Sequence, residues 1–541
     1  MSQLSSKPIS LRKGISGTTG GAFESRLTDR LVAQSRRILA ARPDAAAFAL
    51  GLLSAASLPP FHLVFVLLFA VPGLIALIDR ARGPAATFRL GWWFGFGHHL
   101  VGLYWITEAI LIEAARFWWF VPIAVPALSA VLAAFIGAAT SVARLAPVGW
   151  RRVLALAGGW VLADLVRQFA FTGFPWNPWG SVWEFPGTAG DIFIQLAAIL
   201  GVHGLTWLTV LLAAAPRLRR PGWIAAGMVL LSWAGFGVWR LSGPAPASPR
   251  VAAVLTQGNV PQGEKWDRAQ MLATFERYLA LTAAGRAQAA AEYPRDQTVV
   301  VWPETASPFL LQTDPAARQA IANAARGAIT LAGTVRFDER GRPRNSLLAI
   351  LPNGAADGVY DKWHLVPFGE TQPAWLPLPI QIVPGGGFAP GPGPYNWNLP
   401  ELPPVSALIC YEAAYSGAMV DERNRPAWLV NVTNDAWFGN SAGPRQHLAA
   451  ARLRAVEEGL PLMRAANTGI TAGFDAYGRE LGRLGMGEMG YLVLALPGAL
   501  PKPLYASGGL LIPAGLGLVS VGVGLVPRRR AGLVSETESQ N

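Results

Sequence analysis

Long apolar segments and short polar linkers alternate over the first 240 residues, and one more apolar segment lies near the carboxyl end. Most of these segments reach the roughly 20 residues that a helix needs to cross a bilayer. The pattern therefore predicts eight transmembrane helices, of which the first is short. The predicted spans are residues 45–58, 61–78, 90–112, 117–142, 153–170, 192–215, 223–239 and 506–526.

Arginine follows every second predicted span and is scarce in the other linkers. Cytoplasmic loops of membrane proteins are rich in Lys and Arg, so this alternation predicts that both termini are cytoplasmic. Residues 241–504, between spans seven and eight, then lie on the periplasmic side. The arginines after spans two, four, six and eight are Arg80, Arg82, Arg89, Arg144, Arg151, Arg152, Arg217, Arg219, Arg220, Arg528, Arg529 and Arg530.

The composition agrees with a multi-pass membrane protein. The chain is 52% hydrophobic and 14% charged, whereas soluble domains carry about 25% charged residues. Its formal net charge of +12 is spread over loops and forms no groove, which argues against a nucleic-acid partner. Residues 1–43 lack the apolar core of a signal peptide. They are interpreted as a disordered cytoplasmic lead, and residues 528–541 as a cytoplasmic tail.

The segment 241–504 has a different pattern, in which short β-type runs alternate with helical stretches. Strands that alternate with helices favour an α/β fold whose sheet is covered on both faces. Ligand-binding residues are then expected at the carboxyl ends of strands. Predicted strands are residues 252–256, 298–302, 329–334, 346–351, 405–409, 428–432 and 461–465, and predicted helices are 268–284, 314–327 and 444–458.

Two charged side chains, Glu304 and Lys362, follow predicted strands. Glu304 ends the stretch "VVVWPE", and its apolar neighbours predict a raised pKa that suits a general base. The alternative is a carboxylate that caps the next helix or faces solvent. Lys362 lies in "YDKWHLVPFGE", and a lysine ammonium can hydrogen-bond a developing oxyanion. The alternative is an ordinary surface lysine.

Cys410 is the only cysteine, so the chain has no intramolecular disulfide and no multi-cysteine metal site. It follows the predicted strand 405–409 at a strand-to-helix turn, where helix N–H groups would lower the pKa of the thiol. The alternative is a buried cysteine that acts as a small hydrophobic residue. No metal motif, Walker loop or dinucleotide fingerprint occurs, and the sequence predicts neither a cofactor nor a metal.

The order Glu304, Lys362, Cys410 on one α/β segment resembles the carbon–nitrogen hydrolase (nitrilase) superfamily, over roughly residues 251–495. That resemblance implies an α-β-β-α sandwich with a Glu–Lys–Cys triad. The stretches "NVTNDAWFG" and "RAANTGITAGFDAYGRE" extend it. With the predicted spans, the chain resembles the apolipoprotein N-acyltransferase family, and the stretches "TQGNVPQGEKW", "FTGFPWNPWG", "LVPFGE" and "CYE" add to that likeness.

The resemblance implies an enzyme of the bacterial inner membrane that completes lipoprotein maturation. It would transfer an acyl chain from a phospholipid, typically the sn-1 chain of phosphatidylethanolamine, to the α-amino group of a diacylglyceryl-cysteine apolipoprotein. The course implied is ping-pong, through a thioester on Cys410, with Glu304 as base and Lys362 at the oxyanion. The expected state is a monomer.

Four further residues match positions of this family. The resemblance implies that Glu370 and Glu412 hold Lys362 and tune the charge of the site. Tyr411 would position the oxyanion or an acyl chain, and Trp266 stands at a functionally important position.

Two segments rich in Trp, Phe and Pro, residues 171–183 and 373–394, are interpreted as mobile lids or an entrance for the acyl chain; ordinary interfacial tryptophans are the alternative. Two rival functions share parts of this pattern. A membrane-anchored amidase would use the same triad but would need only one anchor. A transporter with a degenerate α/β domain would lack a triad member, and none is lacking.

Overall fold

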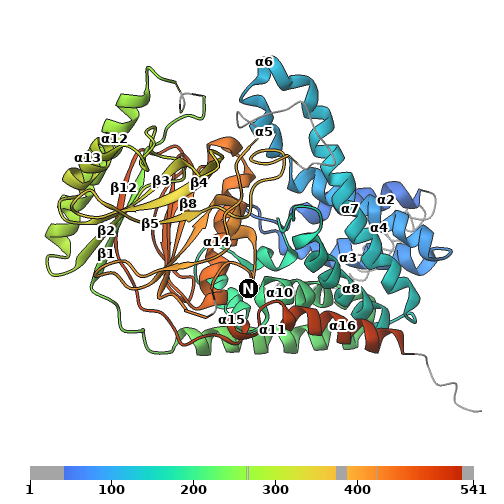
Figure 1. Ribbon diagram of the computed structural model, residues 1–541. Helices are drawn as coiled ribbons and strands as arrows, with labels where there is room; N and C mark the ends of the chain where they lie inside the picture. The colour runs from blue at the N-terminus through green and yellow to red at the C-terminus, as the bar shows by residue number, and fades with distance from the viewer. Residues whose placement is uncertain (1–41, 264, 266, 373–386, 422, 527–541) are drawn as a thin grey trace, which may run out of the picture.

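The computed structural model describes residues 42–263, 265, 267–372, 387–421 and 423–526. A helical part, built before residue 242 and again from residue 504, packs against an α/β part between them (Figure 1). Nearly all of the predicted lead, the predicted tail and Trp266 lie outside the described residues.

Helices occupy all eight apolar segments. Before the α/β part they are α2 (Pro43–Ala55), α3 (Leu67–Arg80), α4 (Pro84–Gly102), α5 (Ile106–Leu111), α6 (Ala114–Phe117), α7 (Val121–Leu145), α8 (Trp150–Phe169), α9 (Thr188–Ile194), α10 (Ala197–Ala213) and α11 (Arg219–Leu241). After it come α15 (Leu504–Gly508) and α16 (Leu511–Leu525). Single 3-10 turns join some of them: η1 (Val64–Val66), η2 (Trp118–Phe120), η3 (Trp179–Trp183) and η4 (Ala215–Leu218).

Two continuous helical stretches are long and apolar enough to cross a membrane, Ala114–Leu145 with 32 residues and Ala215–Leu241 with 27. A third is added if α9 and α10, which are bent by 92° at their junction, form one span. The other apolar segments form helices that are shorter, carry more charged side chains or, like α4, have a lower mean hydropathy. By length and composition, the described helices thus include two or three candidate spans.

Small residues let α2, α4 and α7 pack closely in the helical part. A Cβ atom added to Gly51 of α2 would lie 2.0 Å from the carbonyl oxygen of Phe94 in α4. One added to Gly95 of α4 would lie 2.9 Å from the Cα atom of Ala133 in α7. Close approach of this kind is typical of helix pairs in membranes, where van der Waals packing is a main source of association.

Ion pairs bring several helix ends together. Asp79 at the end of α3 accepts a 2.6 Å hydrogen bond from Arg152 at the start of α8, and it also binds Arg217 in η4. Arg151 donates at 2.7 Å to the carbonyl oxygen of Val526, just after α16. The ends of α3, α10 and α16 and the start of α8 therefore lie on one side of the helical part.

The seven predicted strands are confirmed, with small changes at their ends. They are β1 (Val251–Gln257), β2 (Gln297–Val301), β3 (Ile329–Phe337), β4 (Pro343–Ile350), β7 (Val405–Ile409), β8 (Trp428–Thr433) and β9 (Leu462–Ala466). Further strands that were not predicted are β5 (Ala356–Asp361), β6 (Asn396–Trp397), β10 (Thr471–Phe474), β11 (Glu480–Leu484) and β12 (Gly490–Ala495).

These strands form two six-stranded sheets in the orders β12-β1-β2-β3-β4-β5 and β11-β10-β9-β8-β7-β6. In each sheet three adjacent strands run parallel, β1-β2-β3 and β7-β8-β9, and the other pairs are antiparallel. The sheets face each other across one apolar core, in which Val299 and Leu331 meet Val405 and Val430. The fold is therefore built around two sheets rather than the single sheet that alternating elements suggest.

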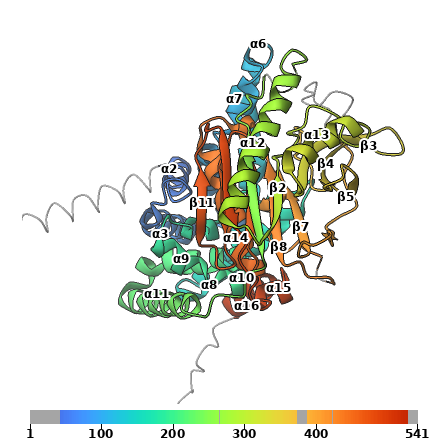
Figure 2. The ribbon, with the colours of Figure 1, turned by 90° about the vertical axis from the view of Figure 1, so that its left-hand side faces the viewer.

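Helices cover the outer faces of both sheets, which gives an α-β-β-α sandwich. The predicted helices appear as α12 (Met271–Glu292), α13 (Pro315–Ala325) and α14 (Ala442–Glu458). The first two pack on the first sheet, and Figure 2 looks directly onto α12. Helix α14 lies between the second sheet and the helical part, where Leu448 shares an apolar cluster with Leu429 and Trp105. The second sheet therefore contacts the helical part through α14.

The ion pairs of Asp79 make a stability prediction. Asp79→Ala should lower the thermal midpoint in detergent, because it leaves the buried guanidinium of Arg152 without its carboxylate, a loss that costs roughly 3 kcal/mol or more. Arg89→Ala is the matched control, since Arg89 is 61% exposed where it pairs with Asp44 and such pairs contribute less than about 1 kcal/mol. Equal thermal midpoints for Asp79→Ala and Arg89→Ala would contradict the stabilising role of the Asp79 ion pairs.

Candidate active site

Glu304 lies just beyond the carboxyl end of β2, in the middle of the first sheet, and is 5% exposed. Its Oε1 atom accepts hydrogen bonds from Lys362 Nζ at 3.1 Å and from Asn345 Nδ2 at 2.7 Å. Its Oε2 atom accepts from the main-chain N–H of Asn434 at 2.8 Å. Donors from three other segments thus fix the carboxylate.

Lys362 follows β5, and its buried ammonium group lies between two carboxylates. Besides Glu304 it contacts Glu370, at 2.9 Å from Oε1 and 2.8 Å from Oε2. Asn345 also bridges the two acids, because its Nδ2 atom lies 2.9 Å from Glu370 Oε1. The carboxylate of Glu370 therefore lies where it can hold Lys362 in place.

Cys410 follows β7 as the first residue of the 3-10 turn η5 (Cys410–Ala414). Its φ of 51° is left-handed, an uncommon conformation for a residue with a side chain. The side chain is buried and interacts electrostatically with Glu304 and Lys362. The structure therefore brings together the three residues that the sequence picked out at separate strand ends.

The charge states differ from those predicted. Burial alone would raise the pKa of Glu304, but the ammonium groups of Lys362 and Lys265, with a hydrogen bond from Asn345, hold that pKa below its usual value. Burial and the Glu304 carboxylate raise the pKa of the Cys410 thiol, and Lys362 offsets this only in part. The predicted raised pKa of Glu304 and lowered pKa of Cys410 are both wrong, because partners from other strands and the burial of the thiol dominate.

The resting site therefore combines an ionised carboxylate, an ammonium and a neutral thiol. Burial disfavours the charged form of Lys362, but Glu304 and Glu370 hold its pKa well above the usual value. An ionised carboxylate that interacts with a neutral thiol is the arrangement that a general base needs before it takes a proton.

Glu412 is fully buried but does not hold Lys362 directly. Its Oε1 atom accepts the main-chain N–H of Trp363 at 2.8 Å, and its Oε2 atom accepts that of Ile409 at 2.7 Å. Burial raises the pKa of Glu412 to about 7 in spite of these donors. Glu412 thus ties the segment that carries Lys362 to the strand that carries Cys410, which corrects the expectation that it contacts the lysine.

Tyr411 points away from the site and toward the helical part. Its hydroxyl donates to the carbonyl oxygen of Gly173 at 3.0 Å, and its ring stacks on Trp176 with 6.3 Å between centroids. The expected role of Tyr411 at an oxyanion does not fit, because its hydroxyl already donates a hydrogen bond to Gly173, which lies far from Cys410 in the sequence. The observed contact joins the nucleophile turn to the helical part.

Two polar residues that contact Glu304 were not predicted from the sequence. Lys265 Nζ lies 3.1 Å from the carbonyl oxygen of Glu304 and 2.5 Å from Thr305 Oγ1. Burial lowers the pKa of Lys265 to about 8, although Glu304 and Cys410 oppose this. Asn345 is the other. Lys265 could have been recognised from its place in "TQGNVPQGEKW", in a chain with few lysines. Asn345 lies in a strand, and no motif in the sequence pointed to it.

A second buried ionic network lies on the other side of Cys410. Asp435, at the start of η6 (Asp435–Phe438), accepts from Arg464 Nη2 at 2.7 Å and from His447 Nδ1 at 2.9 Å. The charge of Arg464, with the contacts of His447 and Thr433, outweighs burial and holds the pKa of Asp435 at about 2. Ligand atoms of Cys410, Asp435 and His447 lie within 4.8 Å of one another. Hydrogen bonds already occupy both ring nitrogens of His447 and both Asp435 oxygens, so the geometry suits a charge network better than a metal.

The segment "FTGFPWNPWG" is packed between the two parts of the molecule. Trp176 and Trp179 are buried, and Trp176 Nε1 donates to Gln446 Oε1 in α14 at 2.8 Å. Trp105 and Asn177 donate to the same oxygen, each at 3.0 Å. These contacts tie Trp176 and Asn177 to α14, which argues against a mobile lid in this part of residues 171–183. Residues 373–386 of the other predicted lid lie outside the described residues.

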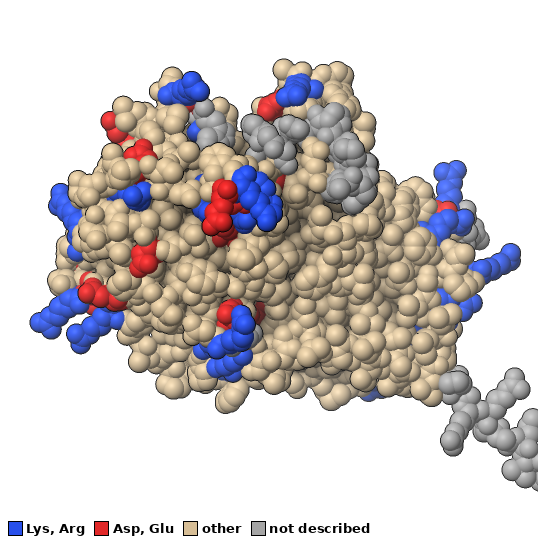
Figure 3. All heavy atoms as spheres, viewed as in Figure 1, with Lys and Arg blue, Asp and Glu red and all other residues tan. Residues whose placement is uncertain are grey.

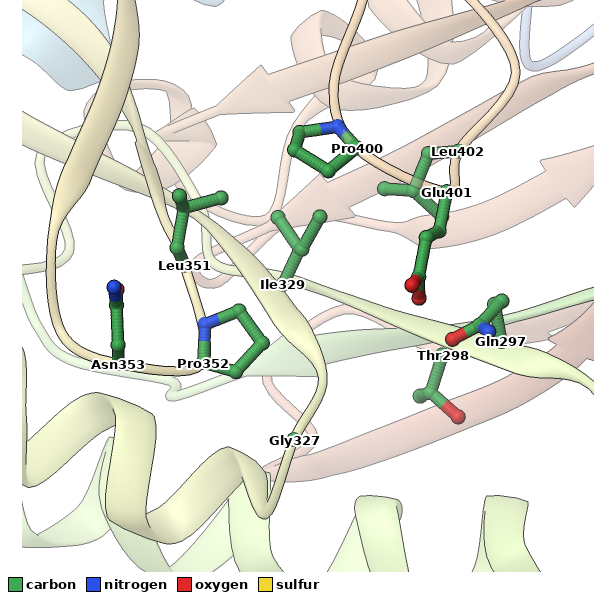
Figure 4. A pocket seen from close by; sticks show the side chains of 10 residues that line it. All are labelled: Gln297, Thr298, Gly327, Ile329, Leu351, Pro352, Asn353, Pro400, Glu401 and Leu402. Atoms are coloured by element: carbon green, nitrogen blue, oxygen red, sulfur yellow. The ribbon is translucent and has the colours of Figure 1, made fainter.

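An open cavity of about 290 Å³ lies at the opposite end of the strands from Glu304. Gln297 and Thr298 at the start of β2, Ile329 at the start of β3 and the loop residue Glu401 line it, and Figure 4 shows the Glu401 carboxylate facing the β2 residues. It contains none of the sequence-predicted site residues and is separate from the candidate active site.

The fold and the buried Glu–Lys–Cys cluster define a carbon–nitrogen hydrolase-type α/β part joined to a helical part. A family model described as carbon-nitrogen hydrolase matches residues 250–500, and one described as apolipoprotein N-acyltransferase N-terminal domain matches residues 50–215. The chain belongs to the apolipoprotein N-acyltransferase family and is, by that membership, an N-acyltransferase.

Individual relatives show how far the likeness extends. The apolipoprotein N-acyltransferase of Rhodopseudomonas palustris is 37% identical over 493 residues, covering 85% of this chain and 90% of that protein. That of Brucella suis biovar 1 is 37% identical over 545 residues, covering 94% and 99%. Among solved structures, an amidase from Nesterenkonia sp. is 19% identical and covers 47% of this chain and 94% of its own, with a TM-score of 0.35.

Lys265→Met should raise the pKa of Glu304, because one of the two cations that lower it is lost. The rate at which iodoacetamide alkylates Cys410, the only cysteine, should then begin to rise at a higher pH than in the unmodified protein, because Glu304 stays protonated to a higher pH. Lys502→Met, at an exposed lysine between β12 and α15, is the matched control. Superimposable profiles for Lys265→Met and the unmodified protein would contradict this assignment.

Proposed function

We propose that this protein transfers an acyl chain from a phospholipid to the α-amino group of a diacylglyceryl-cysteine apolipoprotein, through a thioester on Cys410. The observation that carries the proposal is the burial of one carboxylate, one ammonium and the sole thiol together beyond β2, β5 and β7. Family membership supports the acceptor, and the glycerophospholipid donor, with phosphatidylethanolamine as the typical case, is the class of ester that a membrane enzyme meets at high local concentration.

In the first half-reaction Glu304 takes the thiol proton while sulfur attacks the ester carbonyl carbon. Because the pKa of Glu304 is lowered and that of Cys410 is raised, free thiolate is unfavourable in the resting site. Proton transfer therefore accompanies attack, and the ammonium of Lys362 stabilises the oxyanion that forms. The carbon–oxygen bond then breaks, Glu304 returns the proton to the leaving lysophospholipid, and the acyl chain remains on sulfur.

In the second half-reaction the acceptor amine attacks the thioester carbonyl. Glu304 takes a proton from the amine, and Lys362 again stabilises the oxyanion. The carbon–sulfur bond breaks, the proton passes to sulfur, and the N-acyl lipoprotein leaves. The lysophospholipid leaves before the amine attacks the acyl-enzyme, which is the order of steps in ping-pong covalent catalysis.

We propose further that eight spans hold the enzyme in the inner membrane, with residues 44–240 and 505–527 as the membrane part. The catalytic part, residues 241–504, then lies on the periplasmic side and both termini are cytoplasmic. The arginine-bearing ends joined through Asp79 and the contacts of Trp105 and Asn177 with Gln446 support alternation of helix ends. Figure 3 adds that one broad face of the helical part shows few charged side chains between the α/β part and the far edge.

The test is mass spectrometry of the purified protein after incubation with phosphatidylethanolamine. Cys410 should gain the mass of one long acyl chain, and adding a diacylglyceryl peptide with a free α-amino group should remove that mass and yield an N-acyl peptide. Cys410→Ser and Glu304→Gln should abolish the adduct. Lipid turnover with an unmodified Cys410 would refute the thioester, and release of free fatty acid with no N-acyl peptide would identify a hydrolase instead.

A further inference from the structure

Both ring nitrogens of His447 face hydrogen-bond acceptors. Nδ1 lies 2.9 Å from Oδ1 of Asp435, and Nε2 lies 2.8 Å from the main-chain carbonyl oxygen of Cys410. The ring is fully buried in α14, between the second sheet and the helical part.

The hydrogen-bond inventory of this histidine determines its protonation state. A neutral imidazole donates from one nitrogen only, and neither an ionised carboxylate nor a carbonyl group has a proton to give back. Two distances below 3 Å therefore require protons on both nitrogens. Among the described residues, the one potential donor near Nδ1 is Arg464 Nη2, which lies 3.4 Å from Nδ1 but donates to the Asp435 carboxylate at 2.7 Å.

We propose that His447 is a positioning residue for the nucleophile, and that it acts as an imidazolium. It holds Cys410 through the main-chain carbonyl, which helps to keep this residue in its left-handed conformation, and it places a positive charge within 4.8 Å of Sγ. The inference rests on the proposed role of Cys410 as the acyl carrier.

The charges around His447 fit this assignment. The groups that face it are Asp435 from η6, Arg464 from β9 and Cys410 from η5, with the rings of Trp176 and Phe438 closing the remaining sides. Around the wider site four carboxyl groups face three basic groups, so an imidazolium at His447 supplies the fourth positive charge. These groups are Glu304, Glu370, Glu412, Asp435, Lys362, Lys265 and Arg464.

The position of His447 is also linked to the helical part. The preceding residue, Gln446, accepts hydrogen bonds from Trp105, Trp176 and Asn177 through one oxygen atom. Neighbouring residues on α14 thus contact the helical part on one side and the nucleophile on the other. Because helical neighbours point in different directions, this turn of α14 can connect the two.

The first test is ¹⁵N magic-angle-spinning NMR of the full chain, labelled at its six histidines and reconstituted in lipid. At pH 8 one histidine should retain two protonated ring nitrogens, and His447→Gln should remove that signal. By contrast His364, whose pKa burial lowers to about 4, should be neutral. If no histidine of the unmodified protein is doubly protonated at pH 8, the proposal is overturned, and this result needs no variant.

The second test measures alkylation of Cys410 by iodoacetamide against pH. His447→Gln retains a donor for the Cys410 carbonyl but removes the charge, so its profile should shift upward by about one pH unit, or about tenfold in rate at a given pH. His62→Gln is the control, because His62 bonds the carbonyl oxygen of Val182 away from this site. A lower thermal midpoint with an unmoved profile would show a merely structural role and refute the proposal.

Neither test measures acyl transfer, and neither uses an acceptor peptide. If acyl transfer fails, the NMR and alkylation measurements on His447 can still be interpreted. If those measurements contradict the role of His447, the acyl-enzyme assay is unaffected. The two hypotheses can be rejected independently.

Discussion

The buried ion pair between Glu304 and Lys362 is the interaction on which the candidate site depends. Either group alone would be costly so far from water, and each shifts the pKa of the other toward the charged form. The pair can exist because Glu370 and Asn345 share the same ammonium and carboxylate groups. Charge compensation among these four side chains keeps a proton acceptor beside a thiol that is itself neutral.

This cluster is assembled from separate strands, and its geometry depends on how those strands are tied together. Glu412 joins the segment after β5 to the end of β7 through main-chain N–H groups. Tyr411 and α14 then join the same strand end to the helical part. The relative positions of base, ammonium and thiol thus follow from contacts that continue into the helices, so the two parts of the chain act as one structure.

The sequence was sufficient to predict the main strands, because β-branched runs such as residues 299–301 are bounded by turn residues. It missed β11 because exposed charged residues and Gly482 break the apolar pattern there. Glu304, Lys362 and Cys410 were identifiable as candidates from their places after predicted strands.

Their charge states were not predictable, because these depend on Lys265, Asn345 and Asn434, which reach Glu304 from distant segments. The directions of Tyr411 and Glu412 depend on a tight 3-10 turn where a helix was expected. His447 stood in a correctly predicted helix, but periodicity alone cannot show which nitrogen meets which acceptor.

The neutral, buried thiol of Cys410 also bears on the chemical lifetime of the protein. Peroxides and disulfides react with thiolates far faster than with thiols, and a cysteine that is little exposed is slower still. A nucleophile that loses its proton only when an ester carbonyl is in place would spend most of its time in a form that oxidants attack slowly. Durability of the sole cysteine toward oxidants is thus a consequence of the same burial that makes it hard to ionise.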